Sequence, residues 1–180
     1  MVKFFNQRHM FEHKWEAVTC AVFLKYPNPF SKHVITADVV ERTLDPLTGL
    51  LHSTRLLQKV GSMPAWLARL APAKISNNAL ILEESVVDAQ RGRMTVFTRN
   101  LSYQGWLRVE ERQEFVRTAD GWTLAEVQVK VTGGERAMAM GRLIVGKIEG
   151  FSINKLKDQL SKSRQALLYI LEQLQMNKRL

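Results

Sequence analysis

Three strand–turn–strand pairs between residues 34 and 131 constrain the fold of this chain more than any other feature. Each pair joins two β-rich segments through a short turn containing Gly, and the pairs are 34–44 with 50–60, 78–88 with 93–103, and 106–116 with 122–131. Val127, Val129 and Val131 alternate with polar residues, as in a strand with one buried and one solvated face. Together with a plausible edge strand at 2–11, the sequence predicts an antiparallel sheet of about seven strands.

Two helices are expected to accompany this sheet. Apolar residues at helical spacing predict a short helix over 14–26, which should stop at Pro27 and Pro29. Residues 135–176 lack proline and repeat leucine at helical intervals, so they predict one long helix, with weak points at Gly141, Gly146 and Gly150. The predicted fold is therefore α+β: one domain in which a curved sheet grips a long C-terminal helix and can enclose a cavity.

The charge of the chain favours an anionic partner. Among its 180 residues are 26 Lys and Arg against 17 Asp and Glu, a formal net charge of +9. Nucleic acid, phospholipid or an acidic protein would suit that charge. The basic residues form no dense run and no stacking platform with aromatic residues, so a nucleic-acid-binding module remains an alternative that rests on charge alone. We therefore predict no nucleic-acid partner.

Enzymatic and metal chemistry find little support. The sequence has neither a glycine-rich phosphate loop nor a nucleophile elbow. Cys20 is the only cysteine, which excludes an internal disulfide, and we expect it to be a small buried residue of the first helix. No second ligand at metal spacing accompanies His33. We predict no enzyme activity, no catalytic residue, no cofactor and no metal site.

Basic residues interrupt two otherwise structural patterns. On the final helix, Lys155 and Lys162 lie in one stripe with Ile148, Gln159 and other mainly apolar residues. Two readings are equally open: the lysines extend to the rim of a cavity, or they meet an anion inside it. On strand 50–60 both faces are mixed, and the pattern favours solvent for Arg55 and Lys59.

The apolar segment GSMPAWLARLAPAK at 61–74 connects the first two strand pairs. An apolar loop of this length more often serves as a lid or binding loop than as a plain connector. We predict that Met63, Trp66 and Leu67 enter an anionic membrane surface, helped by the neighbouring lysines at 59 and 74.

Several segments together resemble the PRELI-like family of mitochondrial intermembrane-space phospholipid transfer proteins. They are KYPNPFSKHV (25–34), TRLLQK (54–59), MPAWLARLAPA (63–73), EESVVD (83–88), MTVFTRN (94–100) and the closing helix. SKHV and MPAWLARL resemble the PRELI branch, associated with phosphatidic acid, more than the slowmo branch, associated with phosphatidylserine. The resemblance implies a lipid transfer domain over residues 1–176, followed by a short basic tail at 177–180.

The resemblance also implies a function, a partner and a site. It implies non-enzymatic transfer of phosphatidic acid across the intermembrane space in support of cardiolipin synthesis, a loop that acts as a lid, and a one-to-one complex with a small helical twin-cysteine protein. The family's basic pocket positions fall here on Lys25, His33, Arg55, Lys59, Lys155 and Lys162. Lys25 stands where related carriers often have Arg, so a point charge replaces a planar fork, and a phosphatidylserine carrier remains the alternative within the family.

Overall fold

The computed structural model describes residues 2–60 and 78–177, with 151–153 described for their backbone only. The elements in chain order are β1 Val2–Phe11, α1 Trp15–Phe23, the 3-10 turn η1 Pro29–Ser31, β2 Val34–Leu44, β3 Leu51–Val60, β4 Asn78–Asp88, β5 Arg93–Asn100, β6 Leu107–Arg117, β7 Thr123–Gly133, α3 Glu135–Ala139 and α4 Arg142–Asn177.

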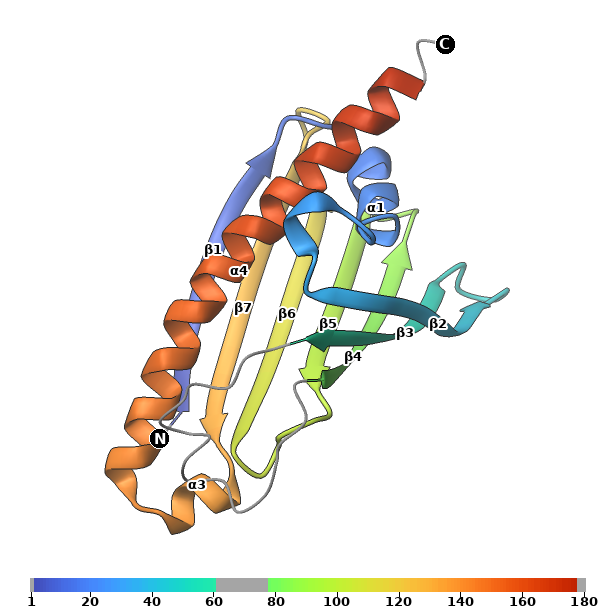
Figure 1. The fold of residues 1–180 in the computed structure, drawn as a ribbon. Coiled ribbons are helices and arrows are strands. Elements are labelled where there is room, and N and C mark those ends of the chain that lie inside the picture. Colours follow the sequence, from blue (N-terminus) through green and yellow to red (C-terminus); the bar gives the residue numbers. More distant parts are fainter. Residues whose placement is uncertain (1, 61–77, 178–180) are drawn as a thin grey trace.

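The seven strands form one sheet in the order β1-β7-β6-β5-β4-β3-β2, and all neighbours are antiparallel. This confirms the predicted α+β class with a seven-stranded sheet and a long C-terminal helix. The sheet is strongly twisted, α4 runs along it over β1 and β7, and α1 lies near the C-terminal half of α4 (Figure 1). The first and second strands of the chain occupy opposite edges, so the segment containing α1 crosses the sheet.

The main apolar core lies where α1, the C-terminal half of α4 and the sheet meet. Trp15 and Val18 of α1 pack there with Phe115 of β6 and Leu167 of α4. The indole Nε1 of Trp15 also donates a hydrogen bond to the Phe115 carbonyl at 3.0 Å. Two smaller apolar clusters, around Trp106 and around Val131 with Leu160, lie elsewhere along α4. The leucine stripe predicted for the long helix thus forms core.

The predicted single helix over 135–176 is divided in two. Gly141 lies between α3 and α4 with a φ of +100°, a conformation that favours glycine because other residues have a Cβ that clashes there. Gly146 and Gly150 remain inside α4 without interrupting it. Of the three glycines named as weak points, only the one with positive φ breaks the helix.

The first helix ends at Phe23, and its exit depends on Asn28. The Asn28 side chain donates to the Lys25 carbonyl at 2.6 Å and accepts from the Phe30 amide at 2.9 Å, which caps η1. Pro27 prevents continuation of the helix, and Asn28 then holds the turn. The expectation that Cys20 is buried was wrong: its side chain is exposed, because it lies on the side of α1 opposite Trp15 and Val18.

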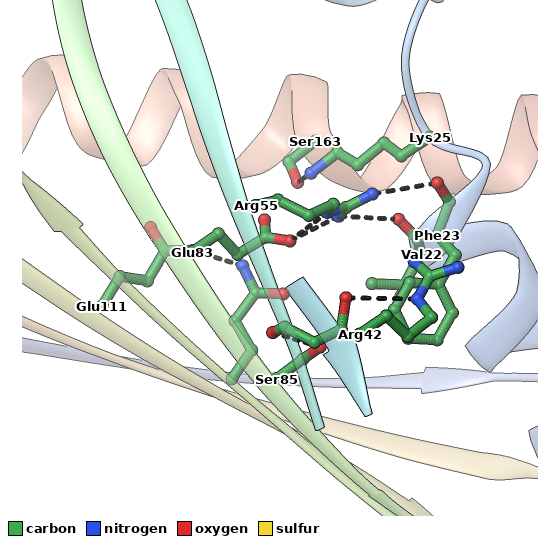
Figure 2. Close-up of polar contacts among 11 residues, drawn as sticks. Val22, Phe23, Lys25, Arg42, Arg55, Glu83, Ser85, Glu111 and Ser163 are labelled. Carbon is green, nitrogen blue, oxygen red and sulfur yellow. Dashed lines mark hydrogen bonds and ion pairs between the residues drawn. The ribbon is translucent and has the colours of Figure 1, made fainter. Parts of the chain in front are cut away.

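Arg55 also departs from the expectation that it points to solvent, since it is only 4% exposed. Its guanidinium forms an ion pair with Glu83 of β4, with 2.7 Å between Nε and Oε1. The same group donates to the carbonyls of Phe23 at 2.9 Å and Val22 at 3.2 Å (Figure 2). A buried cation on β3 therefore satisfies both a largely buried carboxylate and the carbonyl end of α1.

We predict that Arg55→Ala destabilises the protein by about 3–5 kcal/mol, since it leaves Glu83 buried without its partner and the α1 carbonyls without donors. Urea unfolding followed by circular dichroism measures this change. The control is Arg8→Ala, which removes a pair with Glu126 from a side chain that is 71% exposed and should cost less than about 1 kcal/mol. Equal effects of the two substitutions would contradict a structural role for Arg55.

Candidate functional site

A cavity of about 590 Å³ lies between the sheet and α4. Its size falls within the range of about 300–1,000 Å³ that is usual for ligand sites. Apolar side chains from β3, β4, β6 and α4 line part of it, and these are Val60, Ala79, Ile81, Leu107, Val109 and Leu156. Basic side chains line another part, and they are His33, Lys59, Arg99, Lys155 and Lys162. The cavity thus combines an apolar wall with a group of cations.

A smaller cavity of about 70 Å³ adjoins the large one. Both are lined by residues of η1's exit, β3, β5, β6 and α4, and the shared ones are His33, Lys59, Thr98, Glu111 and Gln159. Lys25, Glu83 and Ser163 line the smaller cavity alone. Two cavities with common walls form one candidate site, in which the small cavity is the polar end.

Five of the six predicted basic residues line this site. Lys25 reaches the small cavity because the turn held by Asn28 directs it toward α4, where its Nζ donates to Ser163 Oγ at 2.5 Å. The ammonium also lies 5.3 Å from the centre of the Tyr26 ring, within cation–π range. The prolines and Asn28 of the KYPNP segment therefore bring a basic residue of the α1 exit into contact with the last helix.

The two lysines of the final helix both face the large cavity. Lys155 is half-buried, Gln159 lies between the two, and Lys162 remains exposed. The sequence left open whether these lysines lie at the rim of a cavity or meet an anion inside it. Lys162 is compatible with both, since it lines the cavity while its side chain reaches solvent. Arg55, the sixth predicted residue, is not among the lining residues of either cavity and instead forms the contacts shown in Figure 2.

His33 reports the electrostatic character of the site. Burial lowers the pKa of His33 below its ordinary value of 6.5, and the positive charges of four lysines lower it further. In order of effect these are Lys59, Lys162, Lys155 and Lys25. Side chains from the α1 exit, β3 and α4 therefore act on one imidazole, and their combined charge favours an anion at this place.

The residues Met63, Trp66 and Leu67 of the predicted lid lie outside the described part of the chain. Elsewhere, the structure adds lining residues that the sequence pattern did not indicate. Glu111 and Gln113 lie inward on β6, and Tyr103 lines the large cavity from the β5–β6 connection with a φ of +64°. Alternation from the buried Phe115 back along β6 would have placed Glu111 inward.

Within residues 2–60 and 78–177, no helix is sufficiently long and apolar to cross a bilayer.

Sequence comparisons identify related proteins over nearly the whole chain. The PRELI-like family matches residues 16–177. The human protein "PRELI domain-containing protein 1, mitochondrial" is 36% identical over 177 residues, covering 97% of this chain and 78% of its own. "Protein UPS1, mitochondrial" of Saccharomyces cerevisiae is 33% identical over 176 residues, with coverage of 97% and 96%.

Two solved structures share the fold at low sequence identity. The Zhui aromatase/cyclase from Streptomyces has a TM-score of 0.62 at 8% identity, covering 96% of this chain and 94% of its own. Ara h 8.0201 has a TM-score of 0.54 at 14% identity, with coverage of 96% and 99%. These similarities concern the arrangement of sheet and long helix. The family match and the relatives above 30% identity show that this chain belongs to the PRELI-like family.

Proposed function

We propose that this protein carries phosphatidic acid between mitochondrial membranes without breaking any bond of the lipid, and so supplies cardiolipin synthesis. The observation that carries this proposal is the cavity in which lysines surround His33 beside an apolar wall. The acyl chains would leave water for the apolar wall, which is favourable. The phosphate would accept charge-assisted hydrogen bonds from the lysines.

The basic residues have distinct proposed roles. Lys25, Lys59, Lys155 and Lys162 bind the phosphate, and His33 lies among them. Arg55 has a positioning role for Lys25. Its hydrogen bonds to the α1 carbonyls hold the end of the helix that precedes Lys25. The lid proposal for Met63, Trp66 and Leu67 rests on the resemblance and on their apolar character.

The compartment and the partner follow the family. The related human and yeast proteins are named mitochondrial, and the intermembrane space is the compartment consistent with the family. We propose a one-to-one complex with a small helical twin-cysteine protein, on the basis of the resemblance. Phosphatidylserine is the alternative cargo within the family, because Lys25 provides one point charge and no planar fork.

The proposed function predicts that the purified protein, with its partner present, moves labelled phosphatidic acid between liposomes faster than neutral phosphatidylcholine. Mass spectrometry of the recovered lipid should show an unchanged molecule. Equal movement of the neutral and anionic lipids, or movement of neither, would contradict the proposal. Tight, salt-sensitive oligonucleotide binding without recoverable lipid would instead favour the nucleic-acid alternative.

We predict that Lys155→Glu abolishes most phosphatidic acid transfer, because it places a like charge beside the phosphate. Lys155→Ala or Lys162→Ala should weaken extraction of the lipid from liposomes while the free energy of unfolding stays equal or rises, since grouped lysines repel one another. Liposome transfer and urea unfolding measure the two effects separately.

Lys157→Glu is the matched control for these substitutions. It makes the same charge change on the same helix, at an exposed residue that lines neither cavity and lies 5.3 Å from the Phe5 ring centre. Transfer by this variant should remain close to that of the natural sequence. Similar losses for Lys155→Glu and Lys157→Glu would indicate a general charge effect and no site at Lys155.

The burial of His33 and the lysines around it also predict how stability depends on pH. Because its pKa is lowered in the folded protein, the unfolded chain binds more protons just below pH 6.5. The lipid-free protein should therefore lose stability as the pH falls below about 6.5, and His33→Gln should reduce this loss. The measurement is the urea midpoint between about pH 7.5 and 5.5.

His9→Gln is the comparison for this experiment, because burial and Arg164 lower the pKa of His9 as well. Combining either substitution with Lys59→Ala distinguishes them. That change should diminish the effect of His33→Gln and leave the effect of His9→Gln unchanged. An identical pH dependence with and without His33 would argue against a cationic group around it.

A further inference from the structure

Glu111 is an acidic side chain at the junction of the two cavities. It lines both of them together with His33 and Lys59. The neighbouring Glu110 lies on the other side of β6, where its Oε2 is 3.1 Å from Lys130 Nζ. Adjacent residues of one strand thus present one carboxylate to solvent and one to the candidate phosphate site.

Within the described part of the chain, an ion pair neutralises the charge of Glu83 but not that of Glu111. The strand register aligns Glu83, Thr98 and Glu111 in one row across the sheet. Glu83 is paired with Arg55, whereas Glu111, drawn beside it in Figure 2, accepts a hydrogen bond from the neutral amide of Gln113. Over residues 2–60 and 78–177, Glu111 forms no ion pair with a lysine or arginine.

The other acidic residues of the site act less on its interior. Asp158 of α4 lines the large cavity, but its side chain is exposed, where water and salt screen its charge. Glu111 is half-buried on the sheet, opposite the lysines of α4. Its negative charge therefore opposes any anion that those lysines attract.

We propose that Glu111 is a specificity-determining residue that limits how much negative charge the cavity stabilises. A phosphomonoester loses its second proton near pH 6, so at neutral pH it carries more negative charge than a phosphodiester. Repulsion from Glu111 grows with that charge. Glu111 thus reduces the preference of the cavity for phosphomonoester headgroups, such as phosphatidic acid, over singly charged phosphodiester headgroups. This inference rests on the proposed function.

The test compares two labelled lipids with different phosphate charge. Donor liposomes contain phosphatidic acid or phosphatidylglycerol, and the full chain with its partner extracts them at about pH 7.5, where the phosphomonoester is mostly doubly charged. Glu111→Gln should raise the ratio of phosphatidic acid to phosphatidylglycerol extraction roughly three- to tenfold. Glutamine keeps the shape and the acceptor oxygen for Gln113, so urea unfolding should show an intact fold.

Glu110→Gln is the matched control and should leave the ratio unchanged, since that residue faces away from the cavity. An unchanged ratio in Glu111→Gln, or an equal loss for both lipids, would overturn the inference. A loss confined to phosphatidylserine, tested in a third liposome, would also overturn it and would assign Glu111 to an ammonium group. If the natural sequence extracts no phospholipid at all, the proposed function itself fails, whereas extraction with an unchanged ratio rejects only the role of Glu111.

Discussion

The site depends on the contacts that one buried group makes, the guanidinium of Arg55. It connects three parts of the chain that are distant in sequence: β3, Glu83 on β4, and the last carbonyls of α1. An ion pair of this kind is costly to break because each partner would remain buried without a counter-charge. Since α1 leads directly into the turn that carries Lys25, the same contact sets where the polar end of the cavity begins.

The cavity exists because the middle of α4 is apolar on one face and polar on the next: Leu156 and Leu160 pack against β7, whereas the neighbouring face carries polar residues. Apolar clusters form around Trp15 and Leu167 near the end of the helix, and around Trp106 and Ile148 near its start. Between them, α4 presents Lys155, Gln159 and Lys162 to the sheet, and these side chains do not form a dry interface. A helix that packs through its leucines and carries polar residues on the neighbouring face leaves space for a ligand beside that polar face.

Side chains of both charges line this space. The lysines come from the α1 exit, β3 and α4, and together with burial, the larger cause, their charges lower the pKa of His33. The sheet contributes carboxylates, of which Glu83 is paired with Arg55 while Glu111 is bonded to an amide. The excess of cations favours an anionic headgroup, and the carboxylate of Glu111 reduces that preference.

Local pattern alone was sufficient for much of this molecule. β-rich segments on either side of turn residues predicted six of the strands, and a plausible edge strand at 2–11 completed the seven. The leucine stripe predicted the buried face of α4, because this signal depends on periodicity within one element. The lysine stripe of α4 was visible for the same reason, but whether it faced solvent or a cavity depended on what lay opposite. Resemblance to a family supplied the remaining positions, Lys25 and His33, which no periodicity selects.

Only the tertiary structure decided how these residues are used. Arg55 looked exposed because both faces of β3 are mixed, and its burial depends on Glu83 and on the α1 carbonyls, which lie 28 to 33 residues away. Glu111 gained significance only through the cross-strand register that places it beneath the lysines of α4. The break at Gly141 depended on one backbone angle, which composition does not reveal. Sequence periodicity determines which face of an element is apolar, whereas the partner of a charged side chain depends on contacts between elements.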